Sequence, residues 1–169
     1  VTSIGDSAFN GCSNLQSINV ESTNLHFASI EGILFTKDFA TIICFPVNHR
    51  FSTYTIPTSV TSIGDSAFNG CKNIQSIIIP RSVTSIGKSA FNGCSNLQSI
   101  MVESTNLHFA SIEGILFSKD FSTIIRFPSK HQFIAYNIPT SVTSIGNSAF
   151  SDCYNLQSIT IPTSVTSIG

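Results

Sequence analysis

The chain has 169 residues, a length that suits one ordinary domain, and only 10% of them are charged, against about 25% in average proteins. The formal net charge is -1 and the Lys and Arg residues are scattered, which argues against nucleic acid as a partner. No stretch approaches the roughly 18 apolar residues of a membrane-spanning helix, so we expect no membrane insertion within this chain. A repeating pattern is already under way at Val1 and still runs at Gly169. We therefore expect an excised part of a longer protein, with any targeting signals elsewhere.

The sequence Val-Thr-Ser-Ile-Gly recurs along the whole chain, in steps of 59, 23, 59 and 23 residues. It begins at Val1, Val60, Val83, Val142 and Val165. These steps define an 82-residue unit that occurs as 1–82 and 83–164, followed by a partial repeat at 165–169. Only 18 of the 82 positions differ between the two copies. Repeats of this length predict one continuous solenoid over 1–169, in which each coil packs against its neighbours.

The first half of each 23-residue coil is predicted to turn beneath a sheet. In the coil 60–82, Val60 and Ile63 are expected to point inward, and Gly64 to allow a turn through a positive φ. The Ser-Ala-Phe sequence that follows places Phe68 under the coil, in one short helical or 3₁₀ turn. Since each inward residue meets its own copy above and below, we expect ladders of identical side chains.

The second half of each coil is predicted to form a short strand. Ile77 and Ile79 flank one outward residue, the period-two pattern of a strand with one buried face, and Pro80 ends the strand because it lacks an N–H. Six such strands are expected. Their outward residues are Asn19, Thr55, Ile78, Met101, Asn137 and Thr160. The predicted architecture is a right-handed leucine-rich-repeat solenoid, mostly β, with short 3₁₀ or helical turns and hairpin insertions.

Each 82-residue unit also contains a longer coil of 36 residues, at 24–59 and at 106–141. In the first of these, two β-rich runs surround the polar turn Thr36-Lys37-Asp38, a pattern that predicts a hairpin. Residues 113–128 repeat this pattern. The spacing leaves open whether the longer coil protrudes as a hairpin or forms an extra turn of the solenoid.

The motif L-x-x-I-x-I-P…V-T-x-I-G-x-x-A-F-x-x-C is seen in full at 74–94 and recurs with a period of 23 residues. With this motif and the Gly-Ile-Leu-Phe-x-Lys-Asp hairpin, the whole chain resembles the BspA-like (Treponema pallidum-type) leucine-rich-repeat surface protein family. The resemblance implies adhesion to a host-cell or extracellular-matrix protein. It also implies a location at the cell surface or outside the cell.

No arrangement of residues points to catalysis or to a cofactor. The sequence contains no G-x-S-x-G, H-E-x-x-H or phosphate-binding glycine motif, so we predict that the chain is not an enzyme and holds no cofactor or metal. Asp38 and Glu31 recur in the second unit and are expected to serve the turns of the hairpin. The four histidines are expected in surface loops, too far apart to share a metal. They are His26, His49, His108 and His131.

Four of the five cysteines occupy one position of the repeat, and their spacing resembles no zinc signature. They are Cys12, Cys71, Cys94 and Cys153. We expect buried thiols that fill space as small apolar groups. A disulfide between Cys71 and Cys94, which lie in successive coils, is the alternative. Cys44 stands outside this column and is expected to be the more exposed thiol.

Recognition is expected at outward positions, because packing fixes the inward ones. Ile78 and Met101 should be solvent-facing neighbours on successive strands, a modest signal for binding. The position after glycine also varies, as Asp6, Asp65, Lys88 and Asn147. The candidate binding residues are Ile78, Met101, Lys72, Arg81, Lys88, Asn19, Thr160 and Tyr154.

Three functional hypotheses follow from this pattern. The first is a binding or adhesion module that presents a repeat surface to protein or glycan partners. The second is a structural stalk or spacer, and the third an intracellular scaffold, both with recognition elsewhere in the parent protein. Open solenoid ends expose unpaired strand edges, so end-to-end self-association is also expected.

Overall fold

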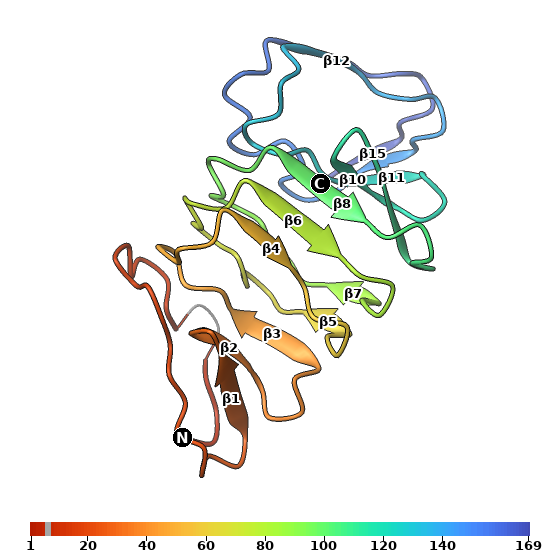
Figure 1. The fold of residues 1–169 in the computed structure, drawn as a ribbon. Helices are drawn as coiled ribbons and strands as arrows, with labels where there is room; N and C mark the ends of the chain where they lie inside the picture. The colour runs from red at the N-terminus through yellow and green to blue at the C-terminus, as the bar shows by residue number, and fades with distance from the viewer. Residues whose placement is uncertain (6–7) are drawn as a thin grey trace.

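The computed structural model describes residues 1–5 and 8–169 and shows a β-solenoid (Figure 1). Asp6, a member of the variable column after glycine, lies outside the described residues. The strands are β1 (Phe27–Ile30), β2 (Ile33–Thr36), β3 (Thr41–Cys44), β4 (Thr53–Thr55), β5 (Ser62–Ile63), β6 (Ser76–Ile79), β7 (Ser85–Ile86), β8 (Ser99–Val102), β9 (Phe109–Ile112), β10 (Ile115–Ser118), β11 (Thr123–Arg126), β12 (Ala135–Asn137), β13 (Ser144–Ile145), β14 (Ser158–Thr160) and β15 (Ser167–Ile168).

The strands predicted from alternating apolar residues form parallel ladders along the solenoid. β4, β6 and β8 make one sheet, and β12 and β14 make a second; we call these five the ladder strands. The sixth predicted strand, around Asn19, is absent from the described residues, so that prediction is wrong. Ile18 donates its N–H to Gly32 O at 2.7 Å, but no parallel strand lies on the other side of it among the described residues. β8 makes the same contact with a hairpin and has β6 as its second partner.

Each longer coil contains a three-stranded meander, which settles the alternative that the sequence leaves open. β2 and β3 form the predicted antiparallel hairpin around the Lys-Asp turn. β1, which the sequence pattern did not reveal, pairs with β2 on its other edge. β3 then joins β5 in parallel, so the meander continues into the short strands β5 and β7 and forms one five-stranded sheet with them, in the order β1-β2-β3-β5-β7. The second unit repeats this arrangement in the order β9-β10-β11-β13-β15.

The hairpin of β1 and β2 and the equivalent hairpin of β9 and β10 each turn at a glycine. The carbonyl oxygen of this glycine, Gly32 or Gly114, accepts the N–H of Ile18 or Ile100. Ile100 of β8 donates its N–H to Gly114 O at 2.8 Å, so this tip stands where a further ladder strand would pair. Gly114 has a φ of 81°, and an added Cβ would lie 2.8 Å from the Cβ of Ser99. Only glycine allows this close approach, and the tip explains why β8 and β12 are not paired directly.

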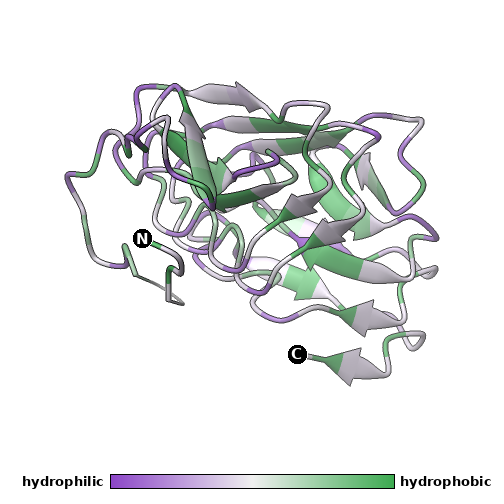
Figure 2. Ribbon diagram, turned by 90° about the horizontal axis from the view of Figure 1, so that it is seen from below, coloured by the Kyte–Doolittle hydropathy of each residue, from purple (hydrophilic) through white to green (hydrophobic). Residues whose placement is uncertain are grey.

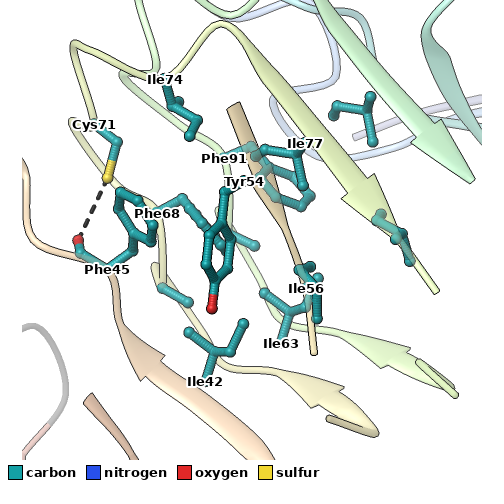
Figure 3. Close-up of a cluster of buried hydrophobic side chains, with 14 of the residues drawn as sticks. Ile42, Phe45, Tyr54, Ile56, Ile63, Phe68, Cys71, Ile74, Ile77 and Phe91 are labelled. Atoms are coloured by element: carbon teal, nitrogen blue, oxygen red, sulfur yellow. Dashed lines mark hydrogen bonds between the residues drawn. The ribbon is translucent and has the colours of Figure 1, made fainter. Parts of the chain in front are cut away.

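The core is built from the predicted inward columns. Val60, Ile63 and Phe68 are buried, and Phe68 lies between the rings of Phe45 and Phe91, with centroids 5.0 and 5.6 Å away (Figure 3). Coloured by hydropathy, hydrophobic segments occur in the strands and also in the connections, and the most hydrophilic segments lie mainly in the connections (Figure 2). No described residue belongs to a helix long and apolar enough to cross a membrane.

Two predictions about the turn that follows β5 are wrong. Gly64 has no positive φ; its small size matters because an added Cβ would lie 2.8 Å from Ile42 O. The expected helical turn is a series of hydrogen-bonded turns instead, with no helix among the described residues. Ser66 adopts a φ of 56°, and this left-handed residue prevents a helix from propagating. The equivalent Ser89 and Ser148 adopt the same conformation.

Candidate functional site

The outward face of the first ladder sheet brings together two of the candidate residues. Ile78 of β6 is directly paired with Met101 of β8, as the 23-residue spacing predicts. Met101 is 54% exposed and Ile78 is half-buried, so they form one apolar patch, which we call the ladder patch. Exposed Thr55 of β4 extends the row on the other side of Ile78, so polar surface borders the patch. Such a patch is an available contact surface for a partner.

The basic candidates Lys72, Arg81 and Lys88 are all exposed. Hydrogen bonds hold the backbone of two of them in place. The main-chain N–H of Arg81 donates to Glu103 Oε2 at 2.8 Å, and that of Lys88 donates to Asp65 Oδ1 at 2.7 Å. None of the three side chains forms an ion pair among the residues that the structure describes. Their ammonium and guanidinium groups are therefore available to an acidic partner group.

The remaining candidates lie apart from the ladder patch. Thr160 is exposed on β14 and pairs with Asn137 in the separate two-stranded sheet. Tyr154 is 81% exposed, and its hydroxyl donates to Asp152 Oδ1 at 3.1 Å, which raises the pKa of the phenol. The structure thus unites Ile78 and Met101 but leaves Thr160, Tyr154 and Asn19 at other places on the solenoid.

Asn19 lines a polar groove of about 670 Å³ that the sequence did not reveal. Gln16, Glu31 and Arg50 lie in the same groove, and the Arg50 and Glu31 side chains form an ion pair at 3.9 Å. This pair is solvent-exposed, so it contributes little to stability, and its charged groups remain available to a ligand. The second unit has Met101, Gln98, Glu113 and Gln132 at these positions, so the groove's chemistry differs between the two units.

Two of the four histidines are structural, contrary to the expectation that all lie in surface loops. His49 and His131 are buried, and each bonds to the tip of the neighbouring hairpin. His131 Nε2 lies 2.8 Å from Glu113 O, and its Nδ1 accepts the N–H of Phe133 at 3.3 Å. This pattern fits a neutral ring with the proton on Nε2. The histidine therefore fastens the hairpin to the coil that follows it.

The aspartates of the hairpin turns act as expected, as turn-stabilising groups. Asp120 accepts hydrogen bonds from the Ser118 hydroxyl at 2.6 Å and from the N–H of Ser122 at 3.0 Å, and these bonds lower its pKa to about 2. Asp38 accepts the equivalent bonds in the first unit. No group of three or more metal-binding side chains occurs within residues 1–5 and 8–169.

The thiols differ from the predicted order of exposure. All five cysteines are free, Cys71 and Cys94 are buried, and Cys12, not Cys44, is the exposed one. Burial raises the pKa of Cys44 to about 11 and likewise that of Cys153 to about 11. The buried Cys71 and Cys94 lie against carbonyl oxygens of the preceding coil, Phe45 O and Phe68 O, whereas Cys12 lies in the first coil that the structure describes.

Labelling of the native protein with a thiol reagent at about pH 8 is expected to give one fast reaction and four slow ones, since only the Cys12 thiol is exposed among the described cysteines and burial raises the pKa of Cys44 and Cys153. The fast phase should disappear in a Cys12→Ser variant, and the slow phases should merge into one fast reaction in denaturant. A fast reaction that persists in the Cys12→Ser variant would contradict the burial of Cys44 and Cys153. Measuring absorbance of the released thiolate with time is sufficient.

Solved structures of two bacterial proteins share this fold. A leucine rich cell surface protein from Faecalibacterium prausnitzii is 30% identical with a TM-score of 0.68, over 96% of this chain and 40% of that one. A leucine-rich repeat protein from Eubacterium ventriosum is 23% identical with a TM-score of 0.61, over 71% of this chain and 44% of that one. The chain therefore spans less than half the length of either protein. No curated protein matches it.

The repeat itself is matched by a family model described as BspA type leucine rich repeat region, in six copies. The matches extend over residues 1–46, 42–138 and 127–169, which together cover the whole chain. The motif, the parallel ladders and the solenoid seen in the solved structures agree with this match. The chain belongs to the family of BspA-type leucine-rich repeat proteins.

Proposed function

We propose that this solenoid is an adhesion module that presents its ladder face to a protein or glycan partner at the cell surface. The ladder patch carries the proposal, since Met101 is 54% exposed and lies beside Ile78 in a sheet that is otherwise polar outside. The similar protein from Faecalibacterium prausnitzii is described as a cell surface protein, which supports the location. By family, the partner is a host-cell or extracellular-matrix protein.

The second candidate is a stalk or spacer, with recognition in another part of the parent protein. The near-identity of the two units favours it, because only 18 of 82 positions differ and a spacer needs no distinct surface. An intracellular scaffold is the third candidate, and the five free thiols are compatible with it. The ladder patch favours the binding module, because both of its residues differ between the units. Met101 of the second unit corresponds to Asn19, and Ile78 of the first unit corresponds to Thr160.

Binding of the purified chain to immobilised matrix proteins and to epithelial cells tests the proposal. We expect saturable binding that is lost in an Ile78→Asp/Met101→Asp double variant, because two buried carboxylates at the contact would oppose association. Asn137→Asp/Thr160→Asp is the matched control, since both residues are exposed and directly paired on β12 and β14, apart from the ladder patch. Circular dichroism checks that each variant is folded.

Binding that is equal in the two double variants would place recognition outside the ladder patch. Absence of binding by the parent chain, at concentrations into the micromolar range, would favour the spacer. Either result would leave the fold unaffected.

A further inference from the structure

The core is interrupted once in each unit, where a longer coil follows a regular one. Phe68 packs on Phe91, but the next ring in the column, Phe127, packs on Phe150 in a separate core cluster. A cavity of about 180 Å³ lies at this interruption in the second unit. Its lining includes Lys88, Ser89, Phe91, Asn92, Arg126 and Asn147.

Two main-chain N–H groups at this cavity have no protein acceptor among the described residues. In the preceding coil, Ser66 and Phe68 donate their N–H groups to carbonyl oxygens of the coil that follows, at 2.9 and 2.8 Å. The equivalent N–H groups of Ser89 and Phe91 have no acceptor among the described residues, because the next coil is displaced by the longer insertion. A main-chain donor without a partner favours an anionic ligand that can accept its proton.

The next N–H in the same row already bonds to a carboxylate. Gly93 donates to Oδ2 of Asp152 across the interruption, at 3.2 Å. This contact shows that the row points toward the following coils, and that a negatively charged oxygen fits against it. The counterpart of Asp152 in the first unit is Gly70, so the carboxylate is a feature of the second unit alone.

A buried positive charge stands at the same cavity. Arg126 is only 2% exposed, and its guanidinium donates to neutral oxygens, including Ser148 O at 2.8 Å and Ser151 O at 3.0 Å. Its Nε has no hydrogen-bond partner, and no carboxylate lies within ion-pair distance of it among the described residues. Asp152 is the nearby negative group, but its oxygens accept from Gly93, Ser151 and Tyr154. The positive charge of Arg126 therefore lacks a close counterion.

The first unit supplies a natural comparison, because the corresponding cavity there is lined by a neutral thiol and a carboxylate instead of Arg126 and Asn147. That cavity, of about 260 Å³, is lined by Cys44 and Asp65, whose counterparts in the second unit are Arg126 and Asn147. In the sequence, Lys88 likewise corresponds to Asp6. At three positions that line the cavity of the second unit, the residue is therefore more positive than its counterpart in the first unit. These are three of the 18 differences between the units.

We propose that the cavity of the second unit is a binding site for a small oxyanion, such as sulfate or the carboxylate of a ligand. The N–H groups of Ser89 and Phe91 donate to the anion, the exposed ammonium group of Lys88 closes over it, and Arg126 supplies the buried positive charge. The site lies after β7 at the turn of the coil, not on the ladder face, so it is independent of the adhesion proposal.

Titration with sodium sulfate at constant ionic strength, followed by amide NMR, tests the site. We expect saturable shifts of the Ser89 and Phe91 amides, with an affinity about tenfold weaker in a Lys88→Asn variant, since one charge-assisted contact is lost. Lys130→Asn is the matched control: it removes one exposed charge elsewhere and introduces the residue found at the equivalent position 48. Its affinity should equal that of the parent chain.

The buried charge is tested by Arg126→Cys/Ser129→Val, which restores the pair Cys44 and Val47 of the first unit. This variant should abolish the saturable shifts; if it does not fold, the comparison of Lys88→Asn with Lys130→Asn decides alone. A parallel titration with sodium acetate distinguishes a tetrahedral dianion from a carboxylate. The proposal is overturned by non-saturable shifts spread over all lysines with both salts, or by equal affinities in the Lys88→Asn and Lys130→Asn variants.

Discussion

Phe68→Ala is expected to lower the free energy of unfolding by about 3–5 kcal/mol, the range for truncation of a buried aromatic ring. Phe68 is fully buried at the centre of the first core cluster. Its ring contacts Phe45, Tyr54 and Phe91, with centroids 5.0, 6.1 and 5.6 Å away (Figure 3). Because coils on both sides hold these neighbours, the structure cannot close the resulting cavity without displacing a ladder.

Phe9→Ala is the matched control, since Phe9 occupies the same repeat position but is partly exposed. Its cost should be about 1 kcal/mol or less, as for most substitutions away from a packed core. The midpoints of urea denaturation, followed by circular dichroism, measure both values. Equal midpoints for the two variants would mean that the aromatic column does not stabilise the solenoid.

Features that depend on the repeat could be predicted from the sequence. Val60 and Ile63 are buried, and Ile78 lies beside Met101, because a 23-residue period places equivalent residues on adjacent coils. The hairpin of β2 and β3 was also predictable, since a polar turn separates two β-rich runs. In each case the decisive interaction is local, or lies between residues one period apart.

Features that depend on contacts between unlike coils were not predictable. β1 has no alternating pattern and exists because β2 lies beside it. His131 has a polar, loop-like sequence around it, yet it is buried because Glu113 O accepts its ring N–H. The turn after Gly64 likewise depends on Ser66, whose left-handed φ has no clear sequence signal, because serine rarely adopts it.

The candidate sites divide in the same way. The ladder patch follows from the repeat, so the sequence could place Ile78 and Met101 together. The oxyanion site arises where the repeat is interrupted, and its donors include main-chain N–H groups that no residue identity reveals. Arg126 differs from Cys44 in the sequence, but only the structure shows that this difference falls beside Lys88 at one cavity.

Gly114→Ala is expected to cost about 2–4 kcal/mol, through two effects that add. Its φ of 81° is unfavourable for any L-residue with a side chain, by roughly 1–2 kcal/mol. The new Cβ would also lie 2.8 Å from the Cβ of Ser99, so the hairpin tip must move away from β8. That movement weakens the bond from the Ile100 N–H to Gly114 O, which closes the edge of the first ladder sheet.

Gly70→Ala separates the two effects. Gly70 has a similar φ of 74°, but an added Cβ there would meet only Val47, at an ordinary contact distance of 3.7 Å. In the second unit this position is Asp152, with a φ of 60°, so a side chain is tolerated. We therefore expect Gly70→Ala to cost about 1 kcal/mol, from backbone strain alone. If urea denaturation gives the same cost for both variants, the hairpin tip can move freely, and the interruption between β8 and β12 is not maintained by close packing.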